Sequence, residues 1–446
     1  MFCLRSLSRA VGPSRLRRTF MSEGFACAEA WEKRFENRLL SKVNLEEMYC
    51  DLENKLNHKR PVTAVDVDIF ANSIRSSSHI QELEELVHRF RQTARTVDTL
   101  ESTHHAVVRA LHRYADTEDL MRVLNDRLNY GIFPDDYCLI FLMDGFIKKG
   151  DFKNAAKVAS LSMLQENFEN KLVNHLALYS CHKYLLDPVE WHQTVEEKNE
   201  EEDDEEEKWV RVKYLRNPFF DDHFDLNDAN SLVGKTLLLV GKEVDDVSHQ
   251  ILGAVLYKKY DTAKQLIKEV IDSKGRVYEV CLNLALNALK SLPVEEGEAG
   301  EKSKELIASM TSEIENLKSK AVNTEDPLIK IEEEIKKLVK QSESELISKQ
   351  KETYDKWETV REEVLMDELK EIKRQSRLKE VERRKEELTL KEQKLFFFDN
   401  EDKIDMAIEN KKVVYPKKWH GKKKKKKSDS EGYIPPEIVK QYKSSP

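Results

Sequence analysis

The sequence predicts an all-α protein, a solenoid of stacked helix pairs followed by long charged helices. Apolar residues recur at steps of three and four over most of residues 29–186 and 227–292, which is the spacing of one face of an amphipathic helix. Residues 29–186 show no strand-like alternation. Apolar residues make up 39% of the chain and charged residues 35%, so part of it must be solvated helix or disordered chain.

The first segment, residues 1–20, is basic. It contains five arginines and several serines, and no acidic residue precedes Glu23. This composition is typical of a mitochondrial transit peptide, so we expect a presequence that directs the protein to the mitochondrial matrix. The alternative is a basic arm that stays on the protein. The chain has no window of about twenty apolar residues, so no membrane span is expected.

Residues 29–190 are expected to form an N-terminal helical-repeat domain, with the clearest units at 101–135 and 136–170. Gly131 suits the positive φ of a helix C-cap, and Pro134 cannot continue a helix. A turn is therefore expected between the two units.

The second unit has a clear internal division. One helix is expected around Leu142–Phe146, a turn at Lys148–Asp151, and a second helix from Phe152 to Leu164. Three alanines of the second helix are small enough to let two helices approach closely.

Residues 101–170 resemble two tandem pentatricopeptide repeats. The repeat of that family is a helix pair that ends in a Gly-Ile-Lys-Pro-Asp-like turn, and Gly131-Ile132-Phe133-Pro134-Asp135 closes the first window. The segment from Tyr130 to Val158, YGIFPDDYCLIFLMDGFIKKGDFKNAAKV, resembles the pentatricopeptide-type protein family of the mitochondrial small ribosomal subunit. The resemblance implies an α-solenoid of degenerate pentatricopeptide-type helix pairs, followed by the long charged helices.

The resemblance also implies where such repeats would read RNA. Repeats of this type bind single-stranded RNA one base per unit, and the family uses the fifth and last positions of each unit. The matching positions are His105 with Asp135, and Ile140 with Asn170. Ile140 has no group that can hydrogen-bond a base edge, and two clear units specify only about two bases. We therefore expect the array to act as a support and not as a base reader.

Four segments follow the first repeat domain. Residues 191–209 contain eight consecutive acids and are expected to form a disordered loop. The alternative is that this acidic loop binds a basic protein partner. Helical periodicity returns in a second repeat block, 210–292. Residues 303–395 are expected to form charged helices, partly coiled-coil-like and interrupted at Pro327. Residues 396–446 are expected to be a largely disordered basic tail.

The basic tail carries the strongest electrostatic signal. No acid lies between Lys411 and Lys427. Lysines that neutralise phosphates release counterions, and a tryptophan can stack on an exposed base, so RNA contact is expected here. The candidate RNA-binding residues are Lys417, Lys418, Trp419, Lys422, Lys423, Lys424, Lys425, Lys426 and Lys427. The alternatives are a solubilising tail and a nuclear-localising tail.

The sequence lacks signatures of catalysis and of cofactor binding. Gly234-Lys235-Thr236 lacks the upstream glycine of a phosphate-binding loop, because Ala229 stands there. His104, His105 and His112 match no zinc spacing, and the six scattered cysteines favour neither a zinc site nor a disulfide framework. The sequence shows no nucleophile motif and no aspartate cluster of an RNA-cleaving domain. We expect no enzyme, no cofactor and no small-molecule substrate.

The resemblance implies a structural component of the mitochondrial small ribosomal subunit that supports mitochondrial translation, while composition predicts the mitochondrial address and periodicity predicts the helical repeats. Its expected partners are the small-subunit rRNA and neighbouring mitochondrial ribosomal proteins. One alternative is a free mitochondrial pentatricopeptide factor that binds RNA and controls a transcript. The other is an RNA-processing enzyme, which the missing catalytic cluster opposes.

Overall fold

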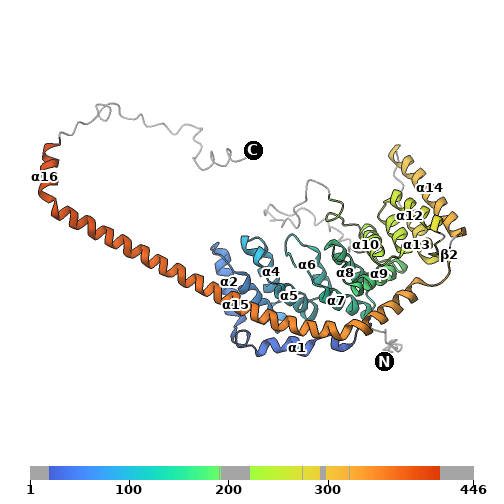
Figure 1. Ribbon diagram of the computed structural model, residues 1–446, viewed down its shortest axis with the longest axis horizontal. Coiled ribbons are helices and arrows are strands. Elements are labelled where there is room, and N and C mark those ends of the chain that lie inside the picture. The colour runs from blue at the N-terminus through green and yellow to red at the C-terminus, as the bar shows by residue number, and fades with distance from the viewer. Residues whose placement is uncertain are drawn as a thin grey trace, which may run out of the picture. The chain divides into compact units, whose positions relative to one another are not determined.

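The structure, a computed structural model, describes the chain in two compact units, Met1–Met366 and Asp367–Pro446. The described residues are 20–189, 191, 221–273, 275–291, 298–320 and 322–411. They are almost entirely helical (Figure 1), and their two short strands, β1 (Val277–Tyr278) and β2 (Val322–Asn323), form one parallel pair. The predicted all-α class is confirmed.

Large parts of three predicted segments lie outside the described residues. They are 1–19 of the expected presequence, 192–209 of the acidic loop and 412–446 of the basic tail. The candidate RNA-binding residues from Lys417 to Lys427 all belong to the last of these. Within the part of the chain that the structure describes, no helix is long and apolar enough to cross a membrane.

The first unit opens with short helices and continues as helix pairs. The opening helices are η1 (Glu23–Ala26), α1 (Ala28–Glu32), η2 (Lys33–Glu36), η3 (Leu40–Lys42) and α2 (Leu45–Asn57). The pairs that follow are α3 (Ala64–Ser73) with α4 (Ile80–Arg91), α5 (Glu101–Tyr114) with α6 (Thr117–Asn125), and α7 (Asp136–Lys149) with α8 (Phe152–Leu164); α9 (Lys171–Leu186) comes next. The 3-10 turns η4 (Ser77–His79) and η5 (Ala94–Asp98) flank α4.

Side-chain caps and glycines set the boundaries of these helices. Asp135 caps α7 by accepting the amide of Cys138 at 2.9 Å, and Gly150 ends α7 with a φ of 78°. Gly131 has the predicted positive φ, 64°. However, α6 already ends at Asn125, so Gly131 lies in the turn between units and is not the helix C-cap.

A second helical block completes the first unit together with the start of α15. Its helices are α10 (Ala229–Glu243), α11 (Val247–Leu256), α12 (Tyr260–Ser273), α13 (Glu279–Ser291) and α14 (Glu298–Lys320). The apolar positions that the periodicity selects point inward, since Ile251, Val270 and Leu289 are buried. One continuous cluster of buried apolar side chains extends from Met21 to Val339, as expected of stacked helix pairs.

The longest element, α15 (Pro327–Asp399), is a single helix of 73 residues. The interruption predicted at Pro327 falls between α14, which ends at Lys320, and α15, where the proline occupies the first helical position and its missing N–H removes no hydrogen bond. Leu328, Ile331 and Ile335 are buried, in agreement with their three-four spacing. The residues of α15 up to Met366 belong to the first unit, and those from Asp367 belong to the second.

In the second unit, the described residues form the rest of α15 and α16 (Glu401–Asn410). Helix therefore continues past residue 395, the predicted end of the charged helices, into the first part of the predicted tail. Charged side chains pair along the helix surface, as Lys370 does with Asp367 at 2.7 Å. Three neighbouring aromatic side chains, Phe396, Phe397 and Phe398, are exposed.

Candidate nucleic-acid interface

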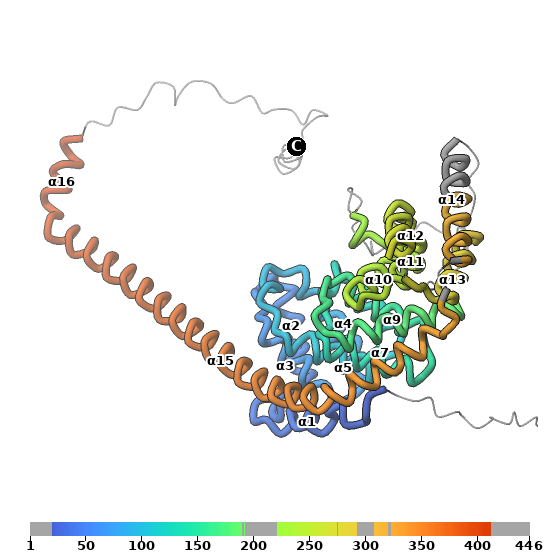
Figure 2. Tube along the Cα trace, turned by 45° about the vertical axis from the view of Figure 1, so that its right-hand side comes forward, coloured from blue at the N-terminus to red at the C-terminus, as the bar shows by residue number. Residues whose placement is uncertain are grey.

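The predicted base-reading positions lie on the face of the array formed by the first helix of each pair. His105 is on α5, Asp135 caps α7, Ile140 is inside α7, and Asn170 caps α9. Residues 327–366 of α15, called the covering segment from here on, run along this same face in both views (Figures 1 and 2).

His105 lies beneath the covering segment and is only 2% exposed. Its Nε2 is 3.1 Å from the hydroxyl of Tyr354, and its Nδ1 is 3.2 Å from Sγ of Cys138. The rings of Trp31 and Trp357 each lie with their centroids 5.0 Å from the His105 ring. This burial lowers the pKa of His105, so the ring is neutral. Both ring nitrogens and the ring faces are thus occupied by protein.

The other three positions have structural partners as well. Ile140 has no exposed surface. Asp135 uses one carboxylate oxygen for the cap of α7. Asn170 caps α9 by accepting the amide of Leu172 at 3.0 Å, and its side-chain amide donates to Asp136 at 3.3 Å. The polar members of the set are therefore used at the turns between helices.

A buried ion pair fixes the covering segment to the N-terminal side of the array. Nε of Arg361 donates to Oδ2 of Asp68 at 2.5 Å, and the two residues are 5% and 0% exposed. The other carboxylate oxygen of Asp68 accepts hydrogen bonds from Ser102 and Thr103 at 2.6 and 2.9 Å. Because α3 carries Asp68 and α5 carries both hydroxyls, one carboxylate joins three helices.

Contacts at the other end of the covering segment reach α9. The hydroxyl of Tyr179 donates to Glu332 at 3.3 Å, and buried Leu328 and Ile331 belong to the shared apolar core. The covering segment thus contacts α3, α5 and α9 through side chains that lie far apart in the sequence. The sequence does not predict that Tyr354, Trp357 and Arg361 form a contact surface, although the steps of three and four between them are a helical signal.

A cavity of about 420 Å³ remains between the covering segment and the repeat turns. Three acids, Glu101, Asp135 and Asp136, line it, whereas Lys349 is the one lysine or arginine among its lining residues. Phosphate groups are repelled by such a balance of charge. The space left on this face therefore suits an RNA backbone poorly.

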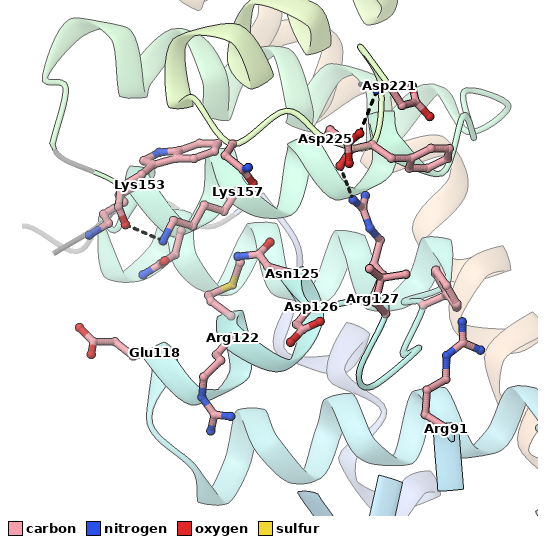
Figure 3. Close-up of a pocket in the computed structure, with 17 residues that line it drawn as sticks. Arg91, Glu118, Arg122, Asn125, Asp126, Arg127, Lys153, Lys157, Asp221 and Asp225 are labelled. Atoms are coloured by element: carbon pink, nitrogen blue, oxygen red, sulfur yellow. Dashed lines mark hydrogen bonds between the residues drawn. The ribbon is translucent and has the colours of Figure 1, made fainter. Parts of the chain in front are cut away.

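A larger cavity of about 840 Å³ lies among α4, α6, α8 and the residues before α10 (Figure 3). Its lining includes five cationic residues, Arg91, Arg122, Arg127, Lys153 and Lys157. It also includes four acids, Glu118, Asp126, Asp221 and Asp225, as well as exposed Phe133 and Phe224. The charges nearly balance, unlike those of a groove that tracks a nucleic-acid backbone.

Several of these cations already have protein partners. Arg122 forms ion pairs with Glu84 and Asp119 at 2.5 and 2.9 Å. Lys157 donates to the carbonyl of Trp191 at 3.1 Å, a contact drawn in Figure 3. Arg127 donates to the carbonyl of Phe224 at 3.0 Å. These contacts hold the walls of the larger cavity in place. The net positive charge left to attract an anion is small.

The Gly-Lys-Thr sequence at residues 234–236 lies inside α10 and serves helix packing. A Cβ on Gly234 would lie 2.6 Å from Cβ of Leu256 and 2.9 Å from the carbonyl oxygen of Gly253. Thr236 donates its hydroxyl to the carbonyl of Leu232 at 2.7 Å, within the same helix. The glycine therefore lets α10 and α11 approach closely, and the segment does not form a phosphate-binding loop.

The geometry alone does not show which protein family the chain belongs to, but a comparison with known families does. The family described as mitochondrial 28S ribosomal protein S27 matches residues 2–387. The chain belongs to this family. Membership of the S27 family makes it a mitochondrial small-subunit ribosomal protein and confirms the resemblance seen from Tyr130 to Val158. The match to the S27 family also includes the whole covering segment, so it extends well beyond the repeats.

Proposed function

We propose that the protein is a non-enzymatic scaffold of the mitochondrial small ribosomal subunit, and that its repeats read no RNA bases. The burial of His105 under Tyr354 and Trp357 of the covering segment carries this proposal. A base that reached His105 would have to displace the covering segment and break the Arg361–Asp68 ion pair. Such a displacement exposes apolar core and leaves a buried carboxylate unpaired, which is unfavourable.

RNA contact in this proposal comes from the lysine-rich tail. Lys422 to Lys427 are six consecutive cations, and Trp419 supplies a ring for stacking on a base. Affinity falls as the salt concentration rises. Each phosphate that such lysines neutralise makes the slope of log affinity against log salt concentration more negative by about 0.7 to 0.9. The tail would then add a salt-dependent contact with the small-subunit rRNA, and the helical body would contact neighbouring ribosomal proteins.

The test replaces Lys422 to Lys427 with glutamine in the full chain and compares sedimentation of mitochondrial lysates at rising salt. A matched control replaces six exposed lysines of α15, Lys370, Lys373, Lys379, Lys385, Lys391 and Lys394, with glutamine. The tail variant should leave the small subunit at lower salt than the wild type, whereas the control should not. Equal behaviour of the tail variant and the wild type rejects the tail contact.

The same gradients separate the scaffold from a free transcript-binding factor. A scaffold sediments with the small subunit and stays there after moderate salt. A pool that sediments slowly and shifts on RNase treatment would favour the free factor instead. Binding of short single-stranded RNA pools to the purified chain gives an independent measure, since a scaffold should select no sequence from them.

We also propose that residues 1–20 direct import into the matrix. The amides of Phe20 and Met21 donate to Oδ1 of Asp144 at 3.0 and 3.3 Å, so the folded body begins at the end of the expected presequence. Protease protection in mitoplasts and N-terminal sequencing of the mature protein test this. A protein digested in mitoplasts without detergent would contradict the matrix location.

A further inference from the structure

Three side chains with metal-ligand chemistry meet in the core of the first unit. His182 comes from α9, His249 from α11 and Cys281 from α13. The first two have no exposed surface, and Cys281 is 1% exposed. No local spacing relates them, which explains why the cysteine pattern alone predicts no zinc site.

The ligand atoms lie close to the separations that a tetrahedral ion requires. Nδ1 of His182 is 3.0 Å from Nε2 of His249, and Sγ of Cys281 is 4.0 Å from the same Nε2. One ligand atom from each residue lies within 4.8 Å of the others. Zinc binds nitrogen at about 2.0 Å and sulfur at about 2.3 Å, so tetrahedral donors lie roughly 3.3 to 3.6 Å apart. Small rotations of the rings therefore suffice to surround an ion.

Asp246 supplies the outer partner that metal-bound histidines usually have. Its Oδ2 lies 2.8 Å from Nδ1 of His249, on the ring edge away from the cluster. Its Oδ1 accepts the amides of Ser248 and His249 at 3.0 and 3.4 Å, because Asp246 also caps α11. With a metal ion bound, His249 would donate Nδ1–H to this carboxylate, and its Nε2 lone pair would face His182 and Cys281.

Nε2 of His182, the ring nitrogen on the edge away from His249, is buried and has no hydrogen-bond partner. The hydrogen bonding of the His182 ring is therefore confined to Nδ1, which faces the cluster. Asp246 contacts His249, and the two imidazoles and the thiol otherwise contact one another in an apolar core.

A second group of similar composition, His105 with Asp135 and Cys138, lacks these properties. Nε2 of His105 already contacts the Tyr354 hydroxyl, and the Asp135 side chain is 45% exposed and caps α7. The distance from Nδ1 of His105 to the Asp135 carboxylate is 3.8 Å. This group is satisfied by protein contacts, so the first cluster is the better candidate.

We propose that His182, His249 and Cys281 bind a structural zinc ion, with Asp246 positioning His249. Cys281 loses its proton to the solvent on binding and coordinates as a thiolate, so protein atoms fill three of the four tetrahedral positions. The ion joins α9 of the first repeat domain to α11 and α13 of the second block. This site is independent of the proposed role on the ribosome.

The test measures metal in the full-length chain purified from zinc-supplied cells. We expect about one zinc per chain in the wild type and in Cys181→Ser, and a small fraction of that in Cys281→Ser. Cys181 is the matched control because it is a fully buried thiol next to His182 in the sequence. Cobalt exchanged into the wild type should show a thiolate charge-transfer band that Cys281→Ser loses and Cys181→Ser keeps.

Measurements on the wild type keep the proposal falsifiable if Cys281→Ser fails to fold. A strong zinc chelator should lower the melting temperature of the wild type, and added zinc, but not magnesium, should restore it. Asp246→Asn should weaken zinc binding by roughly 10-fold to 100-fold. A purified wild type without zinc whose melting temperature ignores the chelator overturns the proposal, as does a folded Cys281→Ser that retains the metal.

Discussion

The guanidinium of Arg361 and the carboxylate of Asp68 form an ion pair across 293 positions of sequence. The pair is buried, and Asp68 also accepts the side-chain amide of Asn72 at 3.0 Å. Both oxygens of this carboxylate are therefore hydrogen-bonded within the protein. This ion pair makes the covering segment part of the fold of the repeats, because removal of the segment would leave the Asp68 carboxylate unpaired in the core.

Arg361→Met should destabilise the protein by about 3 to 5 kcal/mol, since the Asp68 carboxylate is then left unpaired in the core. The measurement is the free energy of unfolding from urea titrations. The matched control is Arg374→Met, which removes an exposed pair with Glu371 on the same helix. That change should alter the free energy by less than about 1 kcal/mol. Equal effects of the two substitutions would show that Arg361 is not buried against Asp68.

Trp357→Ala should open the face that contains His105, because the indole packs against that ring. Burial raises the pKa of the Cys138 thiol well above its ordinary value, so Cys138 should react slowly with maleimide in the wild type. Exposed Cys50 should react quickly in both proteins. In the variant, the rate at Cys138 should rise severalfold while buried Cys181 stays slow. The readout is mass spectrometry of labelled peptides; fast labelling of Cys138 in the wild type would contradict a closed face.

Gly253→Ala should destabilise the protein, because the new Cβ would lie 2.5 Å from the carbonyl oxygen of Gly234. Backbone atoms cannot move aside as a side chain does, so we expect the free energy of unfolding to fall by about 1 to 3 kcal/mol. The matched control is Gly145→Ala in α7, where the nearest atom, Cε1 of His112, is 3.9 Å away. There the helix should gain about 0.5 to 1 kcal/mol. Melting temperatures should therefore shift in opposite directions, and parallel shifts would contradict the close approach of α10 and α11.

The sequence predicts the helix pairs well because their determinants are local. The turn at Gly150 and the helix from Phe152 to Leu164 lie where glycine, Asp151 and the apolar periodicity indicate. The positive φ of Gly131 follows from the same chemistry. Ile140 could be questioned as a base reader from its side chain alone, and its burial agrees with that reasoning.

The covering segment and the metal-type cluster depend on contacts that local patterns do not encode. Tyr354 meets His105 across 249 positions, and the polar residues around Tyr354 predict a solvated helix. Likewise, His182, His249 and Cys281 approach one another only after three helices have packed. Local rules can indicate that these elements are helices, but they cannot indicate which helices lie together.

His112 should make stability depend on pH between about 6.5 and 4. Burial, together with the positive charges of Lys149 and Arg109, lowers its pKa to about 4. Above pH 6.5 the ring is neutral in both the folded and the unfolded chain, so His112 adds no pH dependence there. Between these values only the unfolded chain binds the proton, and stability falls as the pH falls. Below pH 4 both states are protonated, and the loss stops growing.

The expected total loss from this residue is about 3 kcal/mol, from a pKa difference of roughly 2.5 units. His112→Leu removes the titrating ring and keeps an apolar side chain beside Phe141, whose ring centroid is 5.0 Å from that of His112. Free energies of unfolding at pH 7 and pH 4.5 should therefore differ less in His112→Leu than in the wild type, and other titrating groups cancel in this comparison. An unchanged difference would mean that His112 accepts a proton as readily in the folded protein as in the unfolded chain, contrary to its burial.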